Sequence, residues 1–171
     1  MKIILILMLI LCSSFAMAQT KFTSENKLVS LTYPEDWTDV SNETEEIISN
    51  GSIDIKINPV PYEGDDKIDP TVVQDDDFKK MMTLALADAL QEYLFLLESD
   101  EVKVGGINSY YFIWTRFDEP PGDDDPEISR LYMIQTQSSK GIVTFYIFGP
   151  PEEITSENET LAKIISSVKF H

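Results

Sequence analysis

Cysteine and histidine are almost absent from this chain of 171 residues. The one cysteine is Cys12, and the one histidine is His171, the last residue, which we expect to be mobile. Nucleophilic hydrolases need an imidazole held beside a serine or a thiol, and zinc sites need cysteine or histidine ligands. The composition therefore excludes Ser-His-Asp catalysis, Cys-His catalysis and zinc binding, and we predict that the protein is not an enzyme.

Basic residues are also scarce, with 13 Lys and Arg against 30 Asp and Glu and a net charge of −17. A chain this negative repels phosphate backbones, so nucleic acid is excluded as a partner. Strong acidity can indicate disorder, but nine Phe, seven Tyr and two Trp predict a folded core instead. The nucleotide-binding motifs G-x-x-x-x-G-K-S/T and G-x-G-x-x-G do not occur in the sequence, so no cofactor is predicted.

The longest apolar run lies at the N-terminus and is typical of a secretory signal peptide. Lys2 precedes an apolar stretch over residues 3–12, and Ala16-Met17-Ala18 matches the small-x-small pattern of a signal-peptidase site. The stretch is too short for a membrane-spanning helix, which needs about 20 apolar residues. We therefore expect residues 1–18 to be cleaved and the remainder to be exported to the periplasm or the cell exterior.

Cleavage would also remove Cys12, so the mature domain has no cysteine and must fold without disulfides. Residues 19–171 are long enough to bury a core without such bridges, and no linker or repeat divides them. The short leader and the cysteine-free body are typical of a bacterial protein. We predict one globular domain that is monomeric and free of the membrane after cleavage.

Hydrophobic periodicity predicts the order strands, helix, strands, helix. This order is typical of an α+β fold in which helices pack on antiparallel central strands. We expect strands over residues 27–33, 46–50, 52–58, 109–117, 129–137 and 142–148, and helices over about 76–93 and 161–168.

Turn and cap residues divide these elements. Asn50-Gly51 is expected at the tip of a hairpin, and Gly105-Gly106 at a tight turn before the aromatic strand. A polar loop bounded by prolines is expected over residues 59–70. Ser156 and Glu159 have the spacing of a capping box, which predicts that the last helix begins there.

The segment Tyr33-Pro34-Glu35-Asp36-Trp37 resembles the Y-P-x-x-W turn of the PsbP/Mog/DcrB-like superfamily. Gly105-Gly106 before Tyr110-Tyr111, and the ending over residues 164–170, are similar to that group too. The resemblance covers residues 22–170 and implies an α/β/α sandwich with a central, mainly antiparallel sheet and helices on its faces. It also implies a non-catalytic accessory or partner-binding protein, because most members of the group are of that kind.

The resemblance carries over no catalytic residues. Photosynthetic members of the group rely on basic residues for docking, and this chain departs from them with its large acidic excess.

One acidic segment, residues 118–127, is a candidate cation site. Carboxylate oxygens are the ligands that calcium prefers, although the segment lacks the spacing of a known calcium loop. A solvated acidic connection between two strands is the favoured alternative, because clustered charge usually faces water. The six candidate ligands are Asp118, Glu119, Asp123, Asp124, Asp125 and Glu127.

Trp37, Arg116 and Arg130 are candidate binding residues. Trp37 follows a turn, where it either caps the sheet or presents a binding surface, whereas Trp114 lies in an apolar strand and is expected in the core. Arg116 and Arg130 are the only arginines and lie on neighbouring expected strands. They could pair with acidic loops, the favoured role, or together hold an anionic ligand.

The leading functional hypothesis is therefore an exported, non-catalytic protein that binds a protein partner or a ligand through a surface of its domain. The alternative is a binder of calcium or a small ligand that uses the acidic segment 118–127.

Overall fold

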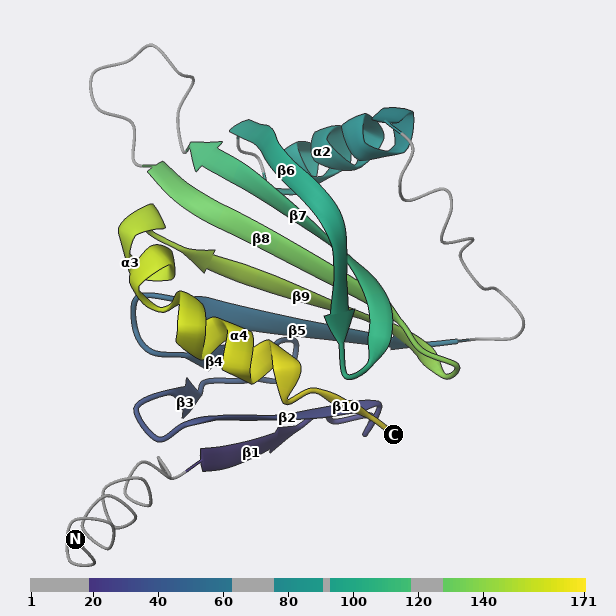
Figure 1. The fold of residues 1–171 in the computed structure, drawn as a ribbon, viewed down its shortest axis with the longest axis vertical. Coiled ribbons are helices and arrows are strands. Elements are labelled where there is room, and N and C mark those ends of the chain that lie inside the picture. The colour runs from purple at the N-terminus through teal and green to yellow at the C-terminus, as the bar shows by residue number, and fades with distance from the viewer. Residues whose placement is uncertain (1–18, 63–75, 91–92, 118–127) are drawn as a thin grey trace, which may run out of the picture.

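A computed structural model describes residues 19–62, 76–90, 93–117 and 128–171 (Figure 1). The expected signal peptide, residues 1–18, lies outside the described residues. The described strands are β1 (Gln19–Thr23), β2 (Val29–Pro34), β3 (Thr38–Asp39), β4 (Glu46–Ser49), β5 (Asp54–Pro61), β6 (Tyr93–Val104), β7 (Ile107–Phe117), β8 (Ile128–Gln137), β9 (Gly141–Gly149) and β10 (Lys169–Phe170). The helices are α2 (Asp76–Leu90), α3 (Pro151–Ser156) and α4 (Asn158–Ser166).

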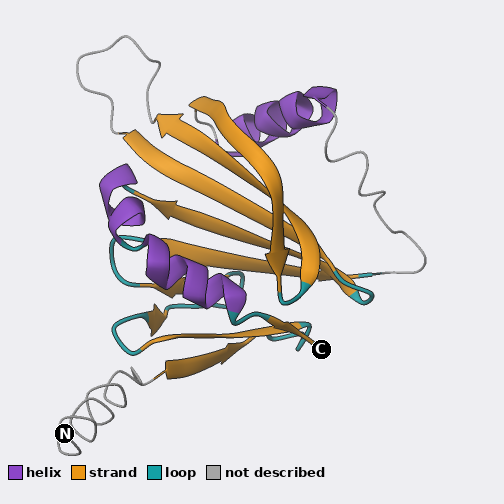
Figure 2. Ribbon diagram, in the orientation of Figure 1, coloured by secondary structure: helices purple, strands orange, loops and turns teal. Residues whose placement is uncertain are grey.

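Two antiparallel sheets make up most of the described structure, with a few short helices (Figure 2). The larger sheet has seven strands in the order β3-β4-β5-β9-β8-β7-β6, and the smaller has the order β1-β2-β10. The expected hairpin at Asn50-Gly51 joins β4 to β5, and the expected antiparallel pair over residues 129–148 is β8 with β9. The prediction of antiparallel central strands is therefore confirmed.

The larger sheet builds a separate hydrophobic cluster from each of its faces. Successive side chains of a strand point to opposite faces. In β9, Phe145 belongs to a cluster that includes Ile164 and Ile165 of α4, whereas Tyr146 packs against the other cluster. Leu86, Ala87 and Leu90 of α2 also pack against that second cluster, around Phe112, Trp114, Leu131 and Met133.

A β-bulge lets β6 contribute to both clusters. Leu94 belongs to the second cluster, whereas Val104 belongs to the first, with Val102 packed against it. All three have even numbers, so strict alternation would place them on one face. The register of β6 against β7 shifts between Leu96 and Glu98. The extra residue, Leu97, therefore reverses the direction in which the following side chains point.

The strand β5 extends further than the sequence predicts, because Pro59 and Pro61 lie within it rather than in a loop. The pairing with β4 ends at Ile57, so within the described residues no strand pairs with β5 on that side where the prolines occur. The Tyr62 N–H donates to the Lys140 carbonyl on the β9 side at 3.0 Å. By alternation, the proline nitrogens face the open side, where no donor is needed.

The end of the chain also differs from the prediction. Ser156 is the last residue of α3 instead of the cap of α4, and its Oγ donates to the Glu153 carbonyl at 2.9 Å. Pro151 starts this additional helical turn, because proline suits the first position of a helix. His171, which the sequence predicts to be mobile, is fixed by two contacts. Its backbone N–H donates to the Leu28 carbonyl at 3.0 Å, and its ring Nε2 lies 2.7 Å from Ser30 Oγ.

The turn between β6 and β7 contacts the C-terminal segment. Gly105 and Gly106 both have positive φ, 55° and 82°. A Cβ on Gly105 would lie 2.7 Å from the Val168 carbonyl oxygen, whereas a Cβ on Gly106 would meet nothing within 4 Å. The absence of a side chain at Gly105 therefore allows the turn to reach the C-terminal segment.

We expect Gly105→Ala to lower the free energy of unfolding by about 1–3 kcal/mol more than Gly106→Ala, because only the first meets backbone atoms. Urea unfolding of both variants measures the difference. Backbone conformation alone predicts the opposite order, because a φ of 55° suits alanine better than one of 82°. Equal losses of unfolding free energy in the two variants, or a larger loss at Gly106, would contradict the close approach of Gly105 to the Val168 carbonyl.

Candidate functional site

Exposed apolar side chains gather at one edge of the larger sheet. Six of the eight large hydrophobic residues that are exposed in the described part of the chain lie on α2 and on the first half of β6. We call this set the apolar edge. Its members, with their exposed fractions, are Met81 (59%), Leu84 (63%), Tyr93 (44%), Phe95 (50%), Leu96 (37%) and Leu97 (55%).

The apolar edge covers both faces of β6. Leu96 pairs with Trp114 and, with Leu84 of α2, forms the apolar part of an open hollow of about 290 Å³ on the α2 face, which Lys79, Lys80 and Thr83 also line. Phe95 points to the other face by alternation, and its ring meets Phe117 edge-on, with the centroids 5.6 Å apart. The side chains on either face are therefore held in place by β7 or α2.

A partly buried hydrogen bond anchors α2 beside this edge. Trp114 is fully buried, which confirms its expected core position. Its Nε1–H donates to Thr83 Oγ1 at 2.9 Å, and the Thr83 hydroxyl donates to the Lys79 carbonyl at 2.9 Å. Because Leu86 and Leu90 pack inward, the opposite side of α2 presents Met81 and Leu84 to solvent.

The second half of β6 has a different character, with Glu98, Asp100, Glu101 and Lys103 after the bulge. The Tyr111 hydroxyl donates to Glu98 Oε1. This hydrogen bond, followed by burial and by the charges of Glu98 and Asp100, raises the pKa of Tyr111 to about 12. The edge is therefore apolar along residues 93–97 and mainly acidic beyond them.

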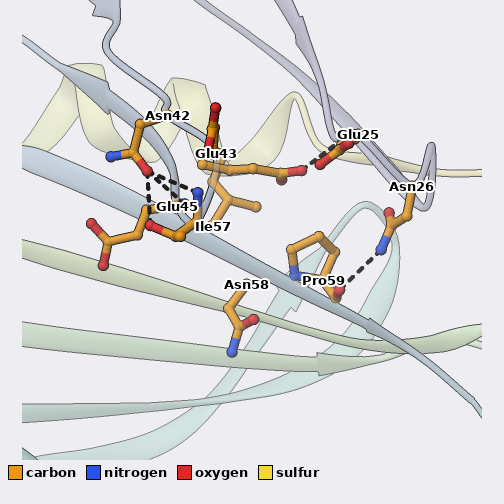
Figure 3. A pocket seen from close by; sticks show the side chains of 10 residues that line it. Glu25, Asn26, Asn42, Glu43, Glu45, Ile57, Asn58 and Pro59 are labelled. Carbon is orange, nitrogen blue, oxygen red and sulfur yellow. Dashed lines mark hydrogen bonds between the residues drawn. The ribbon is translucent and has the colours of Figure 1, made fainter.

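A polar hollow of about 440 Å³ lies on the other side of the molecule, between β5 and the loop before β4 (Figure 3). Most of its polar groups hold the local chain: Asn42 Oδ1 accepts from Thr44 and Glu45 N–H, and Asn26 Nδ2 donates to the Pro59 carbonyl. These bonds favour a structural role. The lining residues are Glu25, Asn26, Asn42, Glu43, Thr44, Glu45, Glu46, Ile57, Asn58 and Pro59.

Glu46 is the unusual group of this hollow. Its Oε1 accepts from the Glu25 N–H at 2.7 Å, whereas its Oε2 is buried with no hydrogen-bond partner. Burial raises the pKa of Glu46 above its ordinary value of 4.5, and nearby Glu25 and Asp39 charges act in the same direction. The hydrogen bond from Glu25 opposes this shift without cancelling it.

Glu46→Gln tests this carboxyl. The raised pKa means that the stability contributed by Glu46 is fully present below about pH 4.5 and is lost as the pH rises through the folded-state pKa. Glutamine does not ionise, so the melting temperature of the variant relative to the wild type should be higher at pH 7 than at pH 4. A difference that is the same at both pH values would contradict the raised pKa.

The structure does not bring the predicted binding residues together. Trp37 is only 3% exposed and belongs to the first core cluster. Its backbone N–H donates to the Pro34 carbonyl at 3.1 Å, which closes the turn before it. Trp37 is therefore a core residue and presents no binding surface.

The two arginines lie on opposite faces of the larger sheet. Arg130 pairs with Thr115 across β7 and β8 and donates to its hydroxyl, whereas Arg116 lies 5.8 Å from the ring centre of Phe148. Neighbouring residues of one strand, such as Thr115 and Arg116, point to opposite faces. The two guanidinium groups therefore cannot hold the same anion.

The candidate cation ligands Asp118, Glu119, Asp123, Asp124, Asp125 and Glu127 lie outside the described residues, so calcium binding by that segment stays a prediction. Among the described residues, no group of three or more His, Cys, Asp or Glu side chains is arranged to hold a metal ion.

Sequence reasoning missed the apolar edge, although two signals point to it. Residues 93–97 are five consecutive apolar residues: Tyr93 is the end of the predicted helix over about 76–93, and residues 94–97, which follow it directly, belong to no predicted strand. Leu84 lies off the apolar stripe of that helix, which ends at Leu90 rather than near Tyr93. An apolar residue outside the stripe that packs on the sheet indicates that the helix contacts a second apolar surface.

Comparison with known proteins identifies the fold. Neither a family model nor a curated protein matches the sequence. A solved structure of cyanobacterial PsbP (CyanoP) from Synechocystis matches with a TM-score of 0.69 at 12% identity, over 93% of this chain and 96% of that one. A mutant of the protein Mog1 matches with a TM-score of 0.58 at 12% identity, over 90% and 96% of the two chains. The chain has the PsbP/Mog1 fold.

A Bacteroides thetaiotaomicron protein also shares this PsbP/Mog1 fold, with a TM-score of 0.56 at 14% identity. The match covers 88% of this chain and 48% of that one. The expected resemblance is therefore confirmed as a likeness of fold. At these identities the likeness concerns the fold alone, so the apolar edge must be interpreted from this chain's own residues. No helix in the described ranges is long and apolar enough to cross a membrane.

Proposed function

We propose that this chain is an exported, non-catalytic accessory protein that binds a protein partner through the apolar edge. The observation that carries the proposal is the set of six exposed apolar side chains on α2 and β6. Exposed apolar side chains that gather in one region of a soluble protein often mark an interaction site. The contacts of Phe95 with Phe117 and of Leu96 beside Trp114 hold part of this surface in place, which lowers the entropic cost of binding.

The remaining features support the same proposal. The chain lacks the residues of the common catalytic centres, and its structural neighbours include PsbP and Mog1, which are consistent with an accessory protein. Residues 1–18 would act as the signal peptide, and residues 19–171 would form one domain. The packing of α2 and α4 against different clusters supports the expected α/β/α sandwich, with a helix on each face of the larger sheet.

Site-specific photo-crosslinking in the native cells tests the proposal. We expect a photoreactive residue at Leu97 or at Met81 to capture the same protein. The matched control is Val40, which is 48% exposed and follows β3 at the opposite edge of the sheet. A photoreactive residue at Val40 should give no adduct. Adding the substitution Leu84→Asp should abolish the adduct formed by the photoreactive residue at Leu97. Equal capture at Val40, or no adduct at the apolar edge, would overturn the proposal, and so would an adduct formed only with a second copy.

A further inference from the structure

The geometry of β6 points to the form in which the partner binds. Resting on the proposed function, we infer that the partner contributes an extended segment that adds to the open edge of β6 as an antiparallel strand. Its apolar residues would lie beside residues 93–97, and basic residues would precede them in the partner's sequence.

The backbone of β6 offers the first argument. It is the last strand of the larger sheet, and within the described residues it pairs with β7 alone. Every second residue of a strand directs its N–H and C=O to one side, so the outer side of β6 presents a row of donors and acceptors. No backbone bond from another described segment meets this row. Such a row is a template for one more strand.

The side chains specify where that strand lies. Natural edge strands are usually protected by charges, proline or bulges. In β6 the charged residues Glu98, Asp100, Glu101 and Lys103 all follow Leu97, and none precedes it. The first half of β6 therefore carries no charged residue of its own, although Lys79 and Lys80 of α2 line the hollow at Leu96. The bulge and the charges of the strand limit the register beyond Leu97.

Both faces of the added strand would meet apolar groups. Side chains on one face would contact Tyr93 and Phe95, and those on the other would contact Leu96 and Leu84 of α2. A strand buried on both faces consists of consecutive apolar residues rather than an alternating pattern. The segment that fits is therefore a short, continuous apolar run.

Charge specifies which end of the antiparallel added strand is basic. In an antiparallel arrangement, residues that precede the apolar run in the partner lie beside Glu98, Asp100 and Glu101. Lysine or arginine there would complement the carboxylates, and the net charge of −17 attracts a basic partner over long range. The same charge opposes a second copy of this chain as the occupant.

Synthetic peptides test the inference with the purified protein. The probe is a fluorescent peptide as long as the 93–101 segment, with lysines at its N-terminal end and valines at its C-terminal end. We expect it to bind at least tenfold more tightly, by fluorescence anisotropy, than the peptide of reversed sequence or a version with glutamate in place of lysine.

N-methylation of the peptide distinguishes strand addition from other docking. A strand uses the N–H of every second residue, so methylating one alternate set should abolish binding while methylating the other set changes it little. Equal effects of the two sets would indicate a helix or side-chain docking and would overturn the inference, as would the absence of binding at millimolar peptide.

Two matched variants separate apolar contact from charge attraction. Phe95→Glu adds a carboxylate to the edge, so pure charge attraction predicts tighter binding of the basic peptide. Strand addition predicts at least tenfold weaker binding, because the apolar contact is lost. Val40→Glu at the opposite edge should leave binding unchanged. If these expectations fail while Leu97 still captures a partner by crosslinking, the inference is wrong and the proposed function stands; failure of the crosslinking refutes the proposed function.

Discussion

The structure depends on one constraint: a single antiparallel sheet must bury apolar side chains on both of its faces. Alternation along each strand sends neighbouring residues to opposite sides, so strands such as β8 and β9 contribute to two cores at once. One core is closed by α4 and the smaller sheet, and α2 packs on the other. The aromatic content of the chain serves this need, because Phe112, Trp114 and Phe145 are fully buried.

The apolar edge follows from the same constraint at the end of the sheet. Here β6 must supply Leu94 to one core and Val104 to the other, and the bulge at Leu97 makes this possible. Before the bulge, alternation places the exposed apolar side chains on both faces of β6, which has no second neighbouring strand in the described structure. The end strand that serves both cores thus also carries the surface to which we assign partner binding.

Much of the fold could be predicted from local patterns. The hairpin at Asn50-Gly51, the two-sided strands β7 to β9 and the helix over 76–90 each carry their own signal in turn residues and periodicity. Predictions failed where a neighbouring segment determines whether a residue joins a strand or a helix. Pro59 can lie in β5 only because β4 has ended, and Ser156 caps nothing because Pro151 starts an earlier helical turn. The site was the least predictable part, since exposure depends on what packs beside a residue.

By itself the sequence determined the scarcity of cysteine and histidine, the acidic character of the chain, and the order of its main elements. It also carried the superfamily resemblance in a turn that ends in Trp37. Only the tertiary structure decided that Trp37 is buried and that Arg116 and Arg130 lie on opposite faces. It also decided that Tyr93 and residues 95–97 are exposed on an edge strand. Composition and periodicity are properties of the chain, whereas burial and edge position depend on contacts between segments distant in sequence.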